Sequence, residues 1–151
     1  MPEPTYRKAT EDDAEAIAAV AAAVAQELGD ASGLPDQITP GALTLRIGGY
    51  GNDAAIFVCV RDEGACGFAV LEPEPLEPGC AQMGVWLAPG ARRQGMGRWL
   101  ALMALDFARS AGYDKVRGTL PPGNEAALSF FSEIGALAQV VGGGMQYELP
   151  L

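Results

Sequence analysis

Apolar residues recur along this chain with two different periods, and their alternation predicts a mixture of helices and strands. Thr10 and Asp13 resemble an N-cap and a first-turn acid ahead of an alanine-rich apolar run, which predicts a first helix over residues 11–28. Apolar residues at intervals of three and four over residues 95–111, followed by Gly112, predict a second helix with a glycine stop. Residues 121–135 predict a turn, a third helix and its stop at Gly135.

Short runs rich in β-branched and aromatic residues predict strands between and after these helices. The predicted strands cover residues 5–10, 54–60, 65–74, 80–87, 114–120, 136–141 and 145–151. Residues 61–64, RDEG, suit a hairpin turn between the second and third strands. Residues 29–41 contain several glycines and prolines and predict a loop, followed by one or two helical turns over residues 41–49. This order of elements predicts an α/β (mixed α+β) fold, and the length suits one domain over residues 1–151.

The chain is acidic, but its charge is unevenly distributed. The formal net charge is −9; residues 1–75 hold thirteen Asp and Glu against four Lys and Arg, whereas residues 76–151 hold six of each. Nucleic acids and anionic membranes both favour a basic protein face. We therefore expect neither as a partner and favour cationic small molecules.

Cysteine and histidine usage argues against a metal site. The chain has no histidine, and Cys59, Cys66 and Cys80 lack CxxC spacing and lie in apolar surroundings. We expect three buried thiols, no metal, and a cytoplasmic location. Because no N-terminal apolar run and no long apolar stretch occur, we expect neither a signal peptide nor a membrane span.

Three arginines and two glycines crowd into the stretch between a predicted strand and the helix that follows it. Arg92, Arg93 and Arg98 flank Gly95 and Gly97. The first N–H groups of a helix lack intrahelical acceptors, and glycines allow an anion to approach them closely. The pattern predicts a pyrophosphate site, although a simple turn with a solvated helix start would use the same residues. Its spacing matches neither the Walker A motif nor the dinucleotide fingerprint.

The stretch APGARRQGMGRW resembles the acyl-CoA motif of the GNAT superfamily of N-acyltransferases, Arg/Gln-x-x-Gly-x-Gly/Ala. Arg92, Gly95 and Gly97 occupy its positions. The segment YRKATEDDAEAIAAV looks like the first strand and helix of that family, and GNEAALSFFSEIGA is similar to a later segment through Asn124 and Gly135. The resemblance covers nearly the whole chain and implies a mixed, mostly antiparallel twisted sheet of six or seven strands flanked by about four helices.

The resemblance also implies an activity, the transfer of an acetyl group from acetyl-CoA, as cosubstrate, to the primary amine of an acceptor. Main-chain groups of residues 85–87 would contact the pantetheine arm and thioester, and residues 92–97 would hold the pyrophosphate. Taken alone, residues 85–87 also fit a core strand, and Asn124 fits a helix N-cap. The positions implied to contact acetyl-CoA are Val85, Trp86, Leu87, Arg92, Arg93, Gln94, Gly95, Met96, Gly97, Arg98, Asn124 and Phe131.

The sequence departs from the family pattern in the residues expected to transfer protons. Phe131 stands where the family often has a tyrosine that acts as general acid. With no histidine, the base is unassigned, because Glu72 and Glu74 fit solvated loop charges and Gln82 is not basic. We therefore name no catalytic side chain. Tyr147 is expected to be a half-buried packing residue with its hydroxyl in water.

Three functions stay open at this point. The chain is an active N-acetyltransferase, a catalytically weak or inactive acyl-CoA-binding regulatory module, or a protein-interaction domain that does not bind CoA. A homodimer is compatible with each of them. In the family that the chain resembles, the acceptor pocket is built largely from segments that correspond to residues 28–47 and 72–79. Acids there hint at a small or cationic acceptor; they are Asp30, Asp36, Glu72, Glu74 and Glu77.

Overall fold

A computed structural model describes residues 3–35, 38–62, 64–92, 94–120, 125–135, 137–141 and 144–151. Within these ranges, seven strands form one sheet in the order β1-β2-β3-β4-β5-β7-β6. The strands are β1 (Thr5–Lys8), β2 (Ala55–Arg61), β3 (Gly64–Pro73), β4 (Cys80–Leu87), β5 (Lys115–Leu120), β6 (Leu137–Val141) and β7 (Gly144–Pro150). Neighbouring strands are antiparallel except β4 and β5, which are parallel. The predicted mixed, mostly antiparallel sheet is confirmed.

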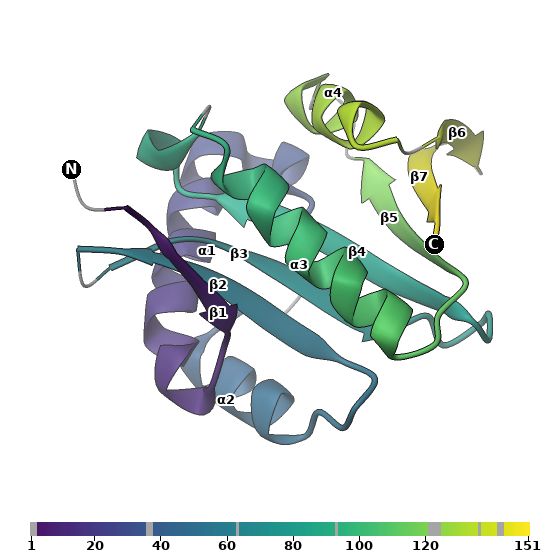
Figure 1. Cartoon of the computed structure of the whole chain (residues 1–151). Helices are drawn as coiled ribbons and strands as arrows, with labels where there is room; N and C mark the ends of the chain where they lie inside the picture. Colours follow the sequence, from purple (N-terminus) through teal and green to yellow (C-terminus); the bar gives the residue numbers. More distant parts are fainter. Residues whose placement is uncertain are drawn as a thin grey trace.

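Four α-helices of the described ranges pack on the two faces of this sheet, as predicted. They are α1 (Ala14–Leu28), α2 (Pro40–Gly48), α3 (Met96–Ser110) and α4 (Glu125–Glu133), with short 3-10 turns η1 (Glu11–Asp13), η2 (Gly29–Ser32) and η3 (Pro89–Ala91). In Figure 1, α3 crosses the front of the sheet and α1 and α2 lie behind it. The sheet therefore separates two hydrophobic cores.

The buried strands divide their side chains between these two cores. Phe57 and Leu71 pack with α3, whereas Ile56 and Phe68 pack with α1 and α2. Because both faces of β2 and β3 are covered, these strands consist of nearly continuous apolar runs.

Several element boundaries differ from the predicted ones because local capping decides them. The helix predicted over residues 11–28 begins as η1, and only then continues as α1. The predicted loop over residues 29–41 contains η2 and the start of α2, whose N-cap Thr39 accepts a hydrogen bond from the Ala42 N–H at 3.2 Å. Of the three thiols expected to be buried, that of Cys66 is only half-buried.

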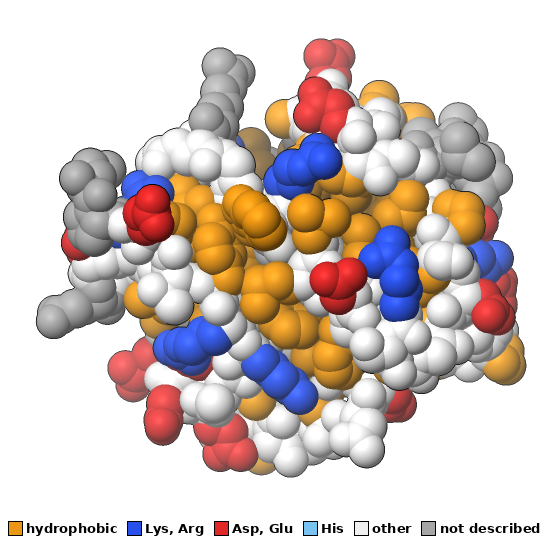
Figure 2. Space-filling view, in the orientation of Figure 1, with side chains coloured by type: hydrophobic (Ala, Val, Ile, Leu, Met, Phe, Trp, Pro, Cys, Tyr) orange, Lys and Arg blue, Asp and Glu red, His pale blue; other side chains and the backbone are white. Residues whose placement is uncertain are grey.

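The front face of the molecule carries a band of hydrophobic side chains with Lys and Arg side chains beside it (Figure 2). Trp99 of α3 is 59% exposed, and its ring centroid lies 6.3 Å from that of Tyr6 on β1. The aromatic contact between α3 and β1 therefore lies at the surface. No described helix is long and apolar enough to cross a membrane.

The parallel pair β4 and β5 separates after three residues. Only Cys80, Ala81 and Gln82 pair with β5, so the remainder of β4 lacks a strand on that side. Figure 1 shows β5 and β7 turning away from β4, with α4 above the opening. A cavity lies at this separation.

Asp13 fastens the first helix to the first strand. Arg7 of β1 donates two hydrogen bonds to its carboxylate, Nη1 to Oδ2 at 2.6 Å and Nη2 to Oδ1 at 2.7 Å, and the Thr10 N–H donates a third at 2.8 Å. Bonding to Arg7 outweighs burial and lowers the pKa of Asp13 below its ordinary value. A carboxylate with a lowered pKa stabilises the fold above its unfolded pKa, near 4, and loses this effect as the pH falls through the folded value.

We expect Asp13→Asn to lower the free energy of unfolding by about 1–2 kcal/mol at pH 7, because the charge-assisted pair with a half-exposed arginine is lost. At pH 3 the difference from the unmodified protein should shrink, since the unfolded chain holds a proton on most Asp13 carboxyls there and must release it to form the pair. Urea unfolding at both pH values measures this, with Asp12→Asn as control because Asp12 is exposed. An equal loss at both pH values would contradict an electrostatic origin.

Candidate functional site

A cavity of about 820 Å³ occupies the opening between β4 and β5. It is lined by the end of α1 with η2, by residues 83–87 of β4, by the loop before α3, by Thr119 of β5, by Tyr147 of β7 and by α4. The cavity therefore reaches both faces of the sheet. It also collects most of the residues predicted to contact acetyl-CoA.

The main chain of β4 presents alternate residues to this cavity. The Ala88 N–H donates to the Cys66 carbonyl at 2.8 Å, so the even-numbered residues at this end direct their main-chain groups toward β3. The main-chain groups of Met83, Val85 and Leu87 consequently face the opening. The main chain of Trp86 faces β3 instead.

Two of these three carbonyls already accept hydrogen bonds from side chains. The Tyr147 hydroxyl donates to the Met83 carbonyl, and Arg92 Nη2 donates to the Leu87 carbonyl at 3.3 Å. Val85 lies between them, and no described strand pairs with its N–H and carbonyl on this side. The open edge of β4 is thus centred on Val85.

Tyr147 and Phe131 form a stacked pair beneath this edge. Their ring centroids lie 3.9 Å apart with an interplanar angle of 12°, and Phe131 is 6% exposed. The Tyr147 ring occupies the space that a Cβ on Gly118 would need, which explains a glycine there. The expectation of a hydroxyl in water is wrong for Tyr147, because the side chain is fully buried and bonded to Met83; burial raises its pKa.

The two motif glycines serve different structural purposes. Gly95 is the N-cap of α3 with φ +81°, and a Cβ there would meet no atom within 4 Å. A Cβ on Gly97 would lie 3.2 Å from Cε1 of Phe130 and 3.3 Å from Cδ1 of Leu87. Gly95 therefore leaves an open approach to the helix start, whereas Gly97 allows α3 to pack closely.

Arg92 is held by a carboxylate that sequence reasoning missed. Its Nη2 lies 2.5 Å from Oε1 of Glu27 near the end of α1, with side-chain exposures of 33% and 36%. The same guanidinium also contacts the Leu87 carbonyl. Arg92 is thus close to the cavity but charge-balanced, while the exposed Arg98 lines the cavity from α3.

Two predicted contact residues, Gln94 and Met96, do not line the cavity. Arg61 at the end of β2 donates from Nη1 to the Gln94 side-chain oxygen at 2.9 Å and places Nη2 3.7 Å from the Met96 sulfur. The Gln94 amide also donates to the Gly90 carbonyl at 3.2 Å. Gln94 and Met96 therefore attach the loop before α3 to the end of β2, away from the cavity. Arg93 and Asn124 lie outside the described residues.

Trp86 contributes its side chain to the cavity. The indole stacks on Phe68 with centroids 5.2 Å apart, and its Nε1–H donates to the Ser32 carbonyl at 2.8 Å. The six-membered ring covers the position that a Cβ on Gly84 would take. Trp86 is therefore fixed on the α1 face of the sheet.

Three of the acids considered as bases or as acceptor contacts bond to other side chains, whereas Asp30 is exposed and Asp36 lies outside the described residues. Glu72 Oε2 accepts from the Tyr50 hydroxyl at 2.6 Å and lies 2.8 Å from Nε of Arg46. Glu77 pairs with Lys115 and Arg117 at 2.8 and 2.9 Å. Glu72 is therefore not the solvated loop charge that was expected. The carboxylates of Glu72 and Glu77 are both neutralised by basic side chains.

Glu74 and Gln82 bond to each other rather than to groups of the cavity. Gln82 Nε2 donates to Glu74 Oε2 at 2.6 Å. Neither residue lines the cavity, nor does Glu72 or Glu77. Within the described ranges, no group of three or more Cys, Asp or Glu side chains could hold a metal ion.

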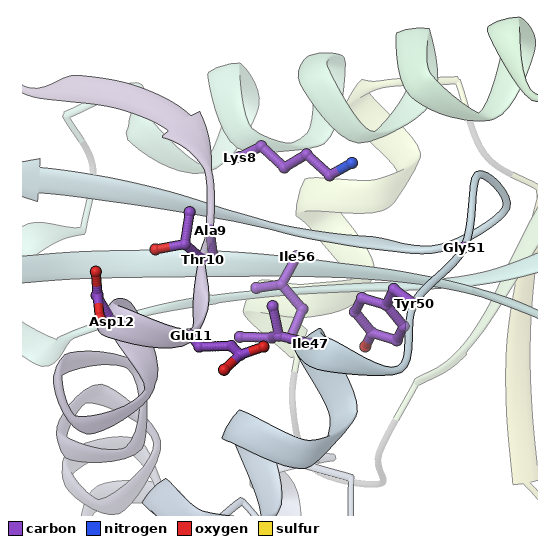
Figure 3. A pocket seen from close by; sticks show the side chains of 9 residues that line it. All are labelled: Lys8, Ala9, Thr10, Glu11, Asp12, Ile47, Tyr50, Gly51 and Ile56. Carbon is purple, nitrogen blue, oxygen red and sulfur yellow. The ribbon is translucent and has the colours of Figure 1, made fainter.

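A second cavity, of about 530 Å³, lies at the β1 edge of the sheet (Figure 3). Glu11 points into it beside Ile47 and Tyr50, whereas Lys8 extends away toward α3, with Nζ 5.4 Å from the centroid of the Phe107 ring. None of the residues predicted to bind acetyl-CoA lines this cavity. The candidate site is therefore the opening between β4 and β5.

Comparisons with known proteins show the family of this chain. Residues 13–136 match the family model described as Acetyltransferase (GNAT) family. This match confirms the GNAT family, which the motif residues Arg92, Gly95 and Gly97 predicted. It also confirms the prediction that the chain is an acetyltransferase. The search of curated proteins gives no match.

Solved structures of that family share the fold over almost the entire chain. The GNAT acetyltransferase from Streptococcus pneumoniae is 14% identical with a TM-score of 0.83, covering 99% of this chain and 100% of its own. PaiA N-acetyltransferase from Thermoplasma acidophilum, in complex with coenzyme A, is 18% identical with a TM-score of 0.81 and coverages of 99% and 100%. YncA from Salmonella typhimurium, with its cofactor acetyl-CoA, is 18% identical with a TM-score of 0.83 and coverages of 99% and 95%. At these identities the likeness establishes the shared fold.

Proposed function

Because the chain belongs to the GNAT family of acetyltransferases, we propose that it transfers an acetyl group from acetyl-CoA to a primary amine. The observation that carries this proposal is the open edge of β4 at Val85, which faces the cavity beside the N-terminus of α3. The complexes of PaiA with coenzyme A and of YncA with acetyl-CoA support the choice of donor.

The described residues fit a pantetheine arm and a pyrophosphate. Val85 and Leu87 offer main-chain groups that an amide-bearing arm can pair with as an added strand would. The N–H groups at the start of α3, reached past Gly95, and the guanidinium groups of Arg92 and Arg98 suit an anion.

The remaining predicted contacts take different roles in this proposal. Gln94 and Met96 hold the loop through Arg61, and Trp86 acts through its indole rather than its main chain. Phe131 lines the cavity above Tyr147. Arg93 and Asn124 keep their predicted roles as proposals only.

The chemistry depends on positioning and on main-chain electrostatics. An amine with a pKa near 10 must lose a proton before it attacks, and the chain has no histidine to accept it, so we propose relay through water. The N–H groups of Val85 and Leu87 can stabilise the negative charge that develops on the acyl oxygen. Phe131 has no proton for the departing thiolate, which is a tolerable leaving group with a pKa near 8.5 in free thiols.

Acetyl-CoA should stabilise the folded protein if it binds the native state alone. At a hundredfold excess over Kd the expected gain is about 2.7 kcal/mol, seen as a raised melting temperature. Thermal unfolding with and without millimolar acetyl-CoA, followed by thiol release with a panel of amines, tests binding and transfer separately. Absence of a melting shift would contradict the proposed donor and favour an interaction domain.

A second candidate function, a regulatory module that binds acyl-CoA without efficient catalysis, is favoured by Phe131 at the usual tyrosine position. It predicts the same melting shift but no acetyl transfer to any amine. The amine panel therefore separates it from the enzyme. One domain over residues 1–151, a cytoplasmic location, a homodimer and the absence of metal stay predictions.

Glu27→Gln should raise the affinity for CoA by a few fold. The substitution frees Arg92 and removes a negative charge beside the proposed pyrophosphate site; the gain is modest because both groups are about one third exposed. Calorimetric titration with CoA at low salt measures it. Glu15→Gln, an exposed position on the same helix, is the control. An unchanged or weakened affinity would show that Arg92 and Glu27 stay paired in the complex.

A further inference from the structure

The part of the cavity that faces α1 is uncharged among the described residues. We refer to this part as the α1 side; its residues are Val24, Leu28, Ser32, Gly33, Gly84 and Trp86. Three charged residues line the rest of the cavity: Arg92 in the loop before α3, Arg98 in the first turn of α3, and Glu133 on α4. The two ends of the cavity therefore differ in chemistry, and the α1 side suits an apolar group.

None of the described acids lines the α1 side, and Asp30 of η2 is exposed outside the cavity. Glu27 pairs with Arg92 at 2.5 Å, and Glu72 pairs with Arg46 at 2.8 Å while accepting from Tyr50. An acceptor with several ammonium groups would lose hydration here without gaining a carboxylate from the described lining. A polycation is therefore disfavoured.

Trp86 supplies a fixed apolar surface at the centre of the α1 side. Its indole is held by stacking on Phe68 and by the hydrogen bond to the Ser32 carbonyl. A fixed aromatic ring binds a flat or aliphatic group without further ordering of its own side chain. Val24 and Leu28 of α1 line the cavity with it.

We propose that the acceptor is a primary amine with an apolar alkyl or arylalkyl substituent, which packs against Trp86 and Leu28 on the α1 side. This inference rests on the proposed function and adds the class of acceptor to it. Trp86 and Leu28 are then residues that determine specificity. The loop acids that hinted at a cationic acceptor do not decide it.

Steady-state kinetics with two amines test this preference. With acetyl-CoA saturating, kcat/KM for phenethylamine should exceed that for spermidine by at least tenfold. Leu28→Glu, which adds a carboxylate to the α1 side, should lower kcat/KM for phenethylamine at least fivefold, chiefly by raising KM. The ratio of kcat/KM for phenethylamine to that for spermidine should then decrease or fall below one. Leu45→Glu makes the same exchange at a position that is 80% exposed on α2 and should leave both values within twofold.

Binding to the protein saturated with CoA provides a readout that does not require turnover. Calorimetry should detect phenethylamine in this complex, with weaker binding to the Leu28→Glu variant and weaker or undetectable binding of spermidine. Preference for spermidine, insensitivity to Leu28→Glu, or no binding of either amine overturns the inference. Binding of phenethylamine that is weakened by Leu28→Glu but gives no acetyl transfer would reject the proposed function and keep the α1 side as a binding site for apolar amines.

Discussion

Val85→Pro should lower kcat/KM for acetyl transfer at least a hundredfold while leaving the protein folded. Proline removes the one N–H at the centre of the open β4 edge and places its ring where a bound arm would pair. Loss of a single donor that stabilises the developing oxyanion costs roughly 10²- to 10³-fold in rate in other enzymes. The main chain of Val85 faces away from β3, so the substitution removes no bond between β3 and β4.

Val85→Ala is the matched control, since it shortens the side chain and keeps the N–H. Circular dichroism and melting temperature report whether the proline variant folds, and CoA titration separates lost binding from lost chemistry. A folded Val85→Pro variant with unchanged turnover would show that the open edge of β4 is not where the donor binds.

Phe131→Ala should lower the free energy of unfolding by about 3–4 kcal/mol. The ring is 6% exposed, stacks on Tyr147 and meets Phe130 edge-on with centroids 5.0 Å apart, so its removal leaves a cavity between α4 and β7. Urea unfolding measures the loss. A change below 1 kcal/mol would mean that α4 repacks and does not depend on this stack.

Phe131→Tyr, at the same position, bears on catalysis rather than stability. We expect acetyl-CoA affinity within a few fold of the unmodified protein, and turnover that is raised or little altered, because a phenol can protonate the thiolate but is not required. If the unmodified protein transfers no acetyl group and Phe131→Tyr does, the regulatory module is the better description.

Local patterns in the sequence predicted the order and type of most elements, although not all of their bounds, and the motif. Strand β4 was predicted with the bounds that it has, because prolines before it and the glycine-rich loop after it punctuate the chain. The mixed sheet followed from the resemblance, which rests on Arg92, Gly95 and Gly97.

The contacts that shape the site were not predictable because they join distant segments. The pairings of Arg92 with Glu27, Gln94 with Arg61, and Tyr147 with the Met83 carbonyl each span more than thirty residues. The sequence predicted a half-buried Tyr147 with its hydroxyl in water, and no local pattern indicated the Met83 carbonyl as its partner. Likewise, which of residues 85–87 face the opening depends on the register of β4 with β3, which no local pattern encodes.

The placement of the two tryptophans gives the protein an intrinsic optical probe. Trp99 is exposed on α3, and Trp86 is fixed on the floor of the cavity by Phe68 and Ser32. A Trp99→Phe background would confine the fluorescence emission to Trp86. Entry of a molecule onto the α1 side would then change the emission intensity and its accessibility to a soluble quencher, so that occupancy of this side could be followed in real time without a labelled ligand.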